Sequence, residues 1–232
     1  NLRASSNYDA TRERFFNALP TSEANYVGMI GDQIRGAPNT SPTQPLPIVE
    51  DTAAVLATEP ADGLRITWLG HSTRLIELDG IRVRTDPEWS ERASPWSYMG
   101  PKRFHRPPLA LDELPPLDAV VISHDHYDHL DTATIRALAQ KTPRFFVPLG
   151  VGSHLEYWGV DPTRITEFGW WDAQTIKGVA IHATPARHFS GRGLNDRDAT
   201  LWASWSVVGP NNRAFFSGDT AMCPGFKQIG DR

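Results

Sequence analysis

The sequence has very little cysteine and no long apolar run. Its single cysteine, Cys223, excludes an internal disulfide framework and leaves the redox compartment open. No stretch approaches the ~18 apolar residues of a membrane-spanning helix, and no basic-then-apolar signal segment opens the chain. The sequence therefore predicts a soluble or peripheral protein without a transmembrane segment.

An excess of positive charge is also missing. The chain carries 23 Lys and Arg against 27 Asp and Glu, which gives a formal net charge of -4. Proteins that bind nucleic acid backbones depend on clustered Lys and Arg, so nucleic acid is not expected as a partner. With 232 residues that are 40% hydrophobic, the chain is long enough to bury a substantial core.

The pattern of the chain changes near residue 62. Residues 1–62 contain a Pro-rich stretch from Pro38 to Pro47 and one short helical pattern, Thr11 to Leu19. We interpret 1–62 as an extended N-terminal arm that buries Phe15, Phe16 and Tyr26 on a domain formed by 63–232. A mobile tail is the alternative that the sequence leaves open.

From residue 64 onward, short apolar runs alternate with turn signals. Asp79-Gly80 is a strong hairpin turn, and the uninterrupted apolar run from Ala119 to Ile122 suits a strand buried on both faces. Asp131 can cap a helix over residues 132–140. The expected strands are 64–69, 73–78, 81–85, 119–123, 145–147, 179–184, 201–208 and 214–217.

The densest chemical signal follows the buried strand directly. Residues 124–129 read His-Asp-His-Tyr-Asp-His, which offers three imidazoles and two carboxylates within six positions. Neutral imidazole nitrogens and carboxylate oxygens are ligands for zinc-type ions. His124 and His126 share one face by two-residue alternation and can chelate one ion, while Asp128 and His129 turn to a second.

The spacing His124-x-His126-x-Asp128-His129 resembles the signature of the metallo-β-lactamase superfamily. Further segments of that pattern follow in order, with His188 just past an expected strand and Asp219 in Ser217-Gly218-Asp219-Thr220. The resemblance implies an α/β fold, the four-layer αβ/βα sandwich, with metals at one edge.

A narrower resemblance runs from about residue 64 to the end. The segments concerned are similar to the N-acylphosphatidylethanolamine-hydrolysing phospholipase D family. They are Trp68-Leu69-Gly70-His71-Ser72-Thr73, Thr85-Asp86-Pro87, Arg92-Ala93-Ser94-Pro95, 98–104, 146–150, Trp170-Trp171, 202–207 and Gly218-Asp219-Thr220.

These resemblances imply a ligand set and a mechanism. His124, His126 and His188 would hold one zinc ion, Asp128 and His129 a second, and Asp219 would bridge them. A hydroxide between the ions would be the nucleophile, because a bound divalent cation lowers the pKa of water from 15.7 to about 7. Asp128 is the predicted catalytic residue. Members of the family carry a last metal-ligating histidine beyond the aspartate motif. A sequence ending at Arg232 therefore implies a C-terminally incomplete domain, with a second metal that lacks one protein ligand as the alternative.

Several other residues receive open interpretations. His71, Asp86 and Asp125 could orient metal ligands or make ordinary structural hydrogen bonds, while His105, His154 and His182 have no motif support. Lys102, Arg103 and Arg106, with Tyr98 and Phe104 among them, could meet a phosphate headgroup or a membrane surface, or form a solvated loop. The eight tryptophans could line a channel for acyl chains or fill the core.

The expected function is therefore a zinc-dependent phosphodiesterase of phospholipase D type that acts on a lipid substrate. Another hydrolase of the same fold remains open, either a lactonase or a soluble phosphodiesterase. A non-catalytic metal-binding protein remains open too. Flavo-diiron redox proteins share the fold but carry Glu at the position of His126, which argues against that class.

Overall fold

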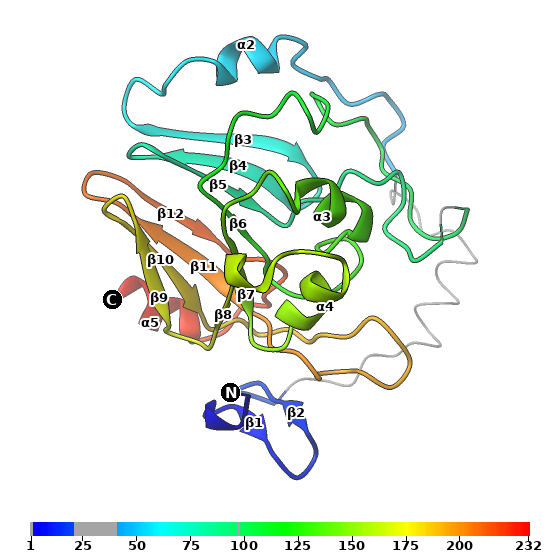
Figure 1. Ribbon diagram of the computed structural model, residues 1–232, viewed down its shortest axis with the longest axis vertical. Helices are drawn as coiled ribbons and strands as arrows, with labels where there is room; N and C mark the ends of the chain where they lie inside the picture. The colour runs from blue at the N-terminus through cyan, green and yellow to red at the C-terminus, as the bar shows by residue number, and fades with distance from the viewer. Residues whose placement is uncertain (1, 21–40, 97) are drawn as a thin grey trace.

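The computed structural model describes residues 2–20, 41–96 and 98–232, and two β-sheets dominate it (Figure 1). The first sheet has six strands and the second has four. In spatial order the first contains β3 (Leu64–Gly70), β4 (Thr73–Leu78), β5 (Ile81–Thr85), β6 (Ala119–Val121), β7 (Phe145–Pro148) and β8 (Ile165–Phe168). The second contains β12 (Arg213–Phe216), β11 (Ser204–Val208), β10 (Val179–Thr184) and β9 (Ala173–Ile176).

The main core lies between the two sheets. Val121 and Phe146 of the first sheet belong to the same buried cluster as Ile181 and Trp205 of the second. The indole nitrogen of Trp205 donates a hydrogen bond to the carbonyl of Ile122 over 2.9 Å. This bond satisfies the one polar group of a fully buried tryptophan and ties the second sheet to the end of β6.

Helices cover the outer faces of the sheets. α3 (Thr132–Leu138) and α4 (Gly152–Tyr157) lie over the first sheet, where their apolar residues join Val120 and Phe145 in a second cluster. α5 (Gly225–Gly230) contacts the second sheet, with the rings of Phe226 and Phe215 5.9 Å apart. The order helix, sheet, sheet, helix confirms the predicted sandwich.

The strand register explains why polar residues gather at one edge. β5 and β6 are parallel, with Thr85 opposite Val121, so the residues that follow both strands emerge side by side. Asp86 leaves β5 with a positive φ of 35°, and its amide donates to the carbonyl of Val121 over 3.0 Å. The histidine-rich segment therefore begins beside Asp86.

Most expected elements are present, with shorter bounds in places. The helix predicted over 132–140 ends at Leu138, and the strand predicted from Leu201 begins at Ser204. Before Ser204 the chain bonds to loops: the amide of Leu201 donates to the carbonyl of Leu149, and that of Ala203 donates to the carbonyl of Ser123. A short 3-10 turn, η2 (Pro162–Arg164), precedes β8.

The helix predicted over residues 11–19 is wrong. The N-terminal residues form a 3-10 turn, η1 (Leu2–Ala4), and a hairpin of β1 (Tyr8–Asp9) and β2 (Arg14–Phe15). The Asp9 carboxylate accepts hydrogen bonds from the amides of Thr11 and Arg12, which turns the chain back. Local side-chain bonds of this kind compete with helix formation.

The arm that precedes the sheets has mixed burial. Phe15 is buried, as expected, but Phe16 is 47% exposed. Tyr26 and Pro38 lie outside the described residues. α2 (Thr52–Leu56) places Leu56 in a buried cluster with Leu69. The boundary between residues 62 and 63 stays a prediction.

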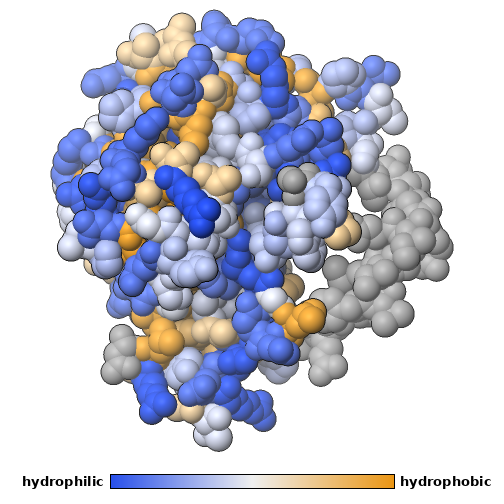
Figure 2. Space-filling view, turned by 45° about the vertical axis from the view of Figure 1, so that its right-hand side comes forward, coloured by the Kyte–Doolittle hydropathy of each residue, from blue (hydrophilic) through white to orange (hydrophobic). Residues whose placement is uncertain are grey.

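No helix in the described part of the chain is long and apolar enough to cross a membrane. On the face shown in Figure 2, hydrophilic residues cover most of the surface and apolar areas lie between them. Single exposed apolar side chains of this kind are ordinary on folded proteins.

Candidate metal centre

Three imidazole rings meet at the edge where β6 ends. Nε2 of His124 lies 2.8 Å from Nδ1 of His126, and Nε2 of His188 lies 3.2 Å and 3.3 Å from those two atoms. His124 and His126 follow β6, whereas His188 follows β10 of the other sheet. The two sheets therefore contribute to one cluster.

The spacing of these nitrogens fits a single cation. A tetrahedral zinc ion with nitrogen ligands at 2.0–2.1 Å holds its ligand atoms about 3.3 Å apart. Burial lowers the pKa of His124 and of His126, and burial together with the neighbouring His126 lowers the pKa of His188 to about 4. The rings are thus neutral near pH 7, which is the form that binds metal.

A second group lies beside the first and is richer in carboxylates. Nε2 of His129 lies 3.2 Å from a carboxylate oxygen of Asp219 and 3.6 Å from one of Asp128. Nε2 of His71 lies 2.9 Å from that same oxygen of Asp128. His71, Asp128 and His129 are close enough to share an ion.

The electrostatics of the second group differ from those of the first. Burial acts to lower the pKa of His129, but the carboxylates of Asp219 and Asp86 outweigh it and raise that pKa to about 10. Burial raises and His71 lowers the pKa of Asp128, and the net pKa lies below its usual range. Nε2 of His129 is buried without a well-formed hydrogen bond to any described residue. A buried imidazole nitrogen that faces two carboxylates without a good hydrogen bond fits a site for a cation.

Asp219 lies between the two groups. Its carboxylate favours the protonated form of both rings: it helps to raise the pKa of His129, and it opposes the lowering of the pKa of His188 by burial. The rings of His124 and His129 are 4.2 Å apart, centroid to centroid. The six residues predicted as ligands are therefore brought together at one edge of the two sheets.

A buried carboxylate, that of Asp86, is linked by hydrogen bonds to both groups. Asp86 accepts hydrogen bonds from the amide and the hydroxyl of Ser123, each over 2.6 Å, and contacts Nδ1 of His129 at 2.7 Å. The Ser123 hydroxyl lies 2.8 Å from Nδ1 of His124. Asp86 thus has the orienting position that the sequence left open.

The other residues with open interpretations fall in different places. Asp125 is buried and accepts hydrogen bonds from the amide of Gly191 over 2.7 Å and the hydroxyl of Thr200 over 2.9 Å. It therefore ties the segment between His124 and His126 to the loop after His188. His154 lies 3.6 Å from this carboxylate.

An apolar pocket of about 710 Å³ opens over the metal centre. Trp68, Pro101 and Phe104 line it, and His126 and Asp128 lie in its wall. The ring of His105 lies 5.1 Å from that of Trp68. The pocket could hold an apolar chain beside the predicted ligands.

The basic residues near this pocket are paired with acids. Lys102 lies 2.6 Å from Glu91, Arg106 lies 2.8 Å from Glu50, and Arg103 forms an ion pair with the buried Glu88. Among the tryptophans, Trp68 lines the pocket, whereas Trp202 and Trp205 are buried in the core.

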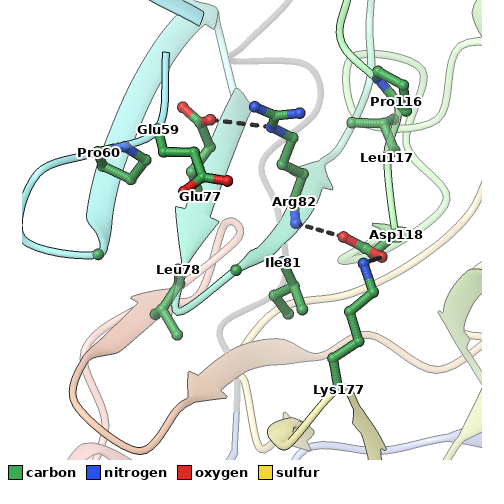
Figure 3. A pocket seen from close by; sticks show the side chains of 12 residues that line it. Glu59, Pro60, Glu77, Leu78, Ile81, Arg82, Pro116, Leu117, Asp118 and Lys177 are labelled. Atoms are coloured by element: carbon green, nitrogen blue, oxygen red, sulfur yellow. Dashed lines mark hydrogen bonds and ion pairs between the residues drawn. The ribbon is translucent and has the colours of Figure 1, made fainter. Parts of the chain in front are cut away.

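Another pocket lies at the turn between β4 and β5, at the opposite end of these strands (Figure 3). Four of its charged side chains form ion pairs: Arg82 pairs with Glu77 at 3.1 Å, and Lys177 pairs with Asp118 at 2.8 Å. No histidine lines it. We therefore assign no chemistry to this pocket.

Comparison with known sequences decides the family. The model of the beta-lactamase superfamily domain matches residues 82–232. The chain belongs to this superfamily. An N-acyl-phosphatidylethanolamine-hydrolyzing phospholipase D of Caenorhabditis elegans is 41% identical over 197 residues, which cover 81% of this chain and 55% of that protein.

Other similar proteins match a comparable share of this chain. An uncharacterized protein of Mycobacterium tuberculosis is 51% identical over 191 residues, covering 82% of this chain and 50% of its own length. The chain thus spans about half the length of these relatives. The isothiocyanate hydrolase from Delia radicum gut bacteria shares the fold, with a TM-score of 0.56 at 19% identity, covering 72% of this chain and 67% of that one.

Sequence reasoning missed two residues at the centre. Ser123 precedes the motif and links Asp86 to His124, a role that its position beside the first histidine could have suggested. Asn17 bonds to the main chain of His188. No pattern in the sequence connects positions 171 residues apart.

Proposed function

We propose that this protein is a zinc-dependent phosphodiesterase of phospholipase D type that cleaves N-acylphosphatidylethanolamine-like lipids. One observation carries the proposal: six predicted metal ligands converge beside a pocket with a mainly apolar surface, and two of them, His126 and Asp128, lie in its wall. The proposal extends the coarser finding, a metal-dependent hydrolase of the beta-lactamase superfamily, to a metal and a substrate.

The proposed ligands divide by chemistry. His124, His126 and His188 would hold one zinc ion with neutral nitrogens, Asp128 and His129 would hold a second, and Asp219 would contact both. When bound, the ions supply positive charge for a phosphoryl transition state and lower the pKa of a water molecule.

The chain's own residues would orient and shield this chemistry. Asp86 fixes the rings of His129 and, through Ser123, of His124. Asp128 is the proposed catalytic residue because its carboxylate lies both in the pocket wall and against His129. Trp68 and Phe104 would hold an acyl chain and exclude water from the reacting bond.

Two features favour a lipid over a small soluble ester. The surface of the pocket beside the ligands is mainly apolar, and relatives at 41% and 36% identity are named as N-acylphosphatidylethanolamine-hydrolyzing phospholipases D. The loop at the pocket also exposes Trp96, Tyr98 and Met99. We propose that this loop makes peripheral contact with a membrane, because aromatic rings favour the lipid–water interface.

A substrate panel tests the proposal. Zinc-loaded protein is offered N-acylphosphatidylethanolamine in mixed micelles, a soluble nitrophenyl phosphodiester and a lactone. The product of each hydrolysis is measured, and for the lipid this product is phosphatidic acid. We expect lipid cleavage that Asp128→Asn abolishes. Cleavage of the lactone or the soluble diester alone would assign the protein to one of the alternative hydrolase classes. Full zinc occupancy without turnover of any ester would make it a metal-binding protein.

A further inference from the structure

The side chain of Asn17 pairs with the main chain of His188 through two hydrogen bonds. The amide of His188 donates to Oδ1 of Asn17 over 3.1 Å, and Nδ2 of Asn17 donates to the carbonyl of His188 over 2.7 Å. The pair satisfies both backbone groups of a residue whose ring meets His124 and His126.

The segment that carries Asn17 is anchored to the same loop. Phe15 is 2% exposed and lies in a cluster with Ala186 and Trp202. Its amide donates to the carbonyl of Asp198 over 2.8 Å, and Arg14 donates to the carbonyl of Asn195 over 2.8 Å. Figure 1 shows this N-terminal hairpin beside the long loop between β10 and β11.

That loop needs support from outside itself. His188 lies in it, between β10, which ends at Thr184, and β11, which begins at Ser204, so no strand partner holds its backbone. A ligand held by irregular backbone loses its position when the backbone shifts by about 1 Å, and supporting hydrogen bonds prevent this shift.

We propose that Asn17 is a positioning residue of the metal centre, which holds His188 in place for the first ion. The inference rests on the proposed function, since it assumes that His188 binds metal. It also assigns a role to residues that precede 82–232, the part matched by the superfamily model.

The test replaces Asn17 with leucine, which has a similar volume and makes neither bond. The matched control is Asn195→Leu. Asn195 is an exposed residue of the loop that carries His188, and its main-chain carbonyl contacts Arg14. Zinc retained against a competing chelator gives the affinity of each ion. We expect Asn17→Leu to lower the binding affinity of one zinc ion by about 10-fold, the lower end of the range for outer partners of metal ligands. The affinity of the other ion should stay unchanged.

Hydrogen exchange of the metal-free protein gives a second readout. The His188 amide should exchange faster in Asn17→Leu and at the wild-type rate in Asn195→Leu. Unchanged zinc affinity with unchanged exchange overturns the inference. If Asn17→Leu fails to fold, Phe15→Ala takes its place, because it loosens the same segment without touching His188, and the same two outcomes apply.

The two proposals fail in different ways. Wild-type protein that binds no zinc overturns the proposed function, and the assignment of Asn17 to a metal centre fails with it even if exchange at His188 still responds. Zinc binding without hydrolysis overturns the function alone. If the wild-type protein binds zinc and hydrolyses the lipid, but neither zinc affinity nor exchange at His188 responds to Asn17→Leu, only this inference is overturned.

Discussion

Nδ1 of His129 donates a hydrogen bond to a carboxylate oxygen of Asp86 over 2.7 Å, and both side chains are fully buried. The bond leaves Nε2 of His129 facing Asp128 and Asp219. The same carboxylate oxygen accepts from Ser123, whose hydroxyl can then accept from Nδ1 of His124. One carboxylate thereby sets the orientation of two imidazoles.

Asp86→Asn should disturb both rings. The amide has one acceptor where the carboxylate has two, so either the amide of Ser123 or Nδ1 of His129 loses its partner. We expect zinc affinity to fall by about 10- to 100-fold and the free energy of unfolding to fall by about 1–3 kcal/mol. Elemental analysis and thermal unfolding measure the two effects. Asp79→Asn, at the β4–β5 turn, is the matched control, and equal zinc affinity in both variants would refute the role of Asp86.

Asp128→Asn should abolish turnover in a protein that still folds. The carboxylate is 39% exposed and contributes little to the core, but its loss removes a proposed metal ligand and its charge. We expect activity to fall by more than about 100-fold, beyond the cost of losing an outer partner. The measurements are turnover and circular dichroism, with Asp112→Asn at an exposed position as the control. Wild-type turnover in Asp128→Asn would contradict the assignment.

The sequence predicted the centre better than it predicted the surroundings. His124, His126, Asp128 and His129 are near one another in the chain, and the buried strand before them fixes where they emerge. The prediction of an N-terminal helix was wrong because the hydrogen bonds of Asp9 and the packing of Phe15 on another loop determine the conformation of that segment. Tertiary contacts of this kind leave no periodic signal.

Metal binding should depend on pH much more strongly at the second position than at the first. The pKa of His188 is lowered to about 4, so protons compete weakly at the first position between pH 7 and pH 5. The pKa of His129 is raised to about 10, so a proton must leave before Nε2 binds an ion at the second. Zinc titrations from pH 5 to pH 9 should show one affinity that changes little and one that rises with pH. Two affinities that rise in parallel would show that the difference between the pKa values does not govern binding.

Phe104→Ala should separate binding of the chain from the chemical step. The ring lines the apolar pocket while remaining 58% exposed, so its removal leaves the core intact. Losing part of an apolar contact costs about 1–2 kcal/mol, which corresponds to a KM about 5- to 30-fold higher for a long-chain lipid. The turnover number and the hydrolysis of a soluble phosphodiester should stay the same. Tyr157→Ala, an exposed aromatic residue on α4 outside this pocket, controls for general effects on the surface. An unchanged KM for the lipid would mean that the acyl chain binds elsewhere, because a chain in this pocket would lose its contact with the ring.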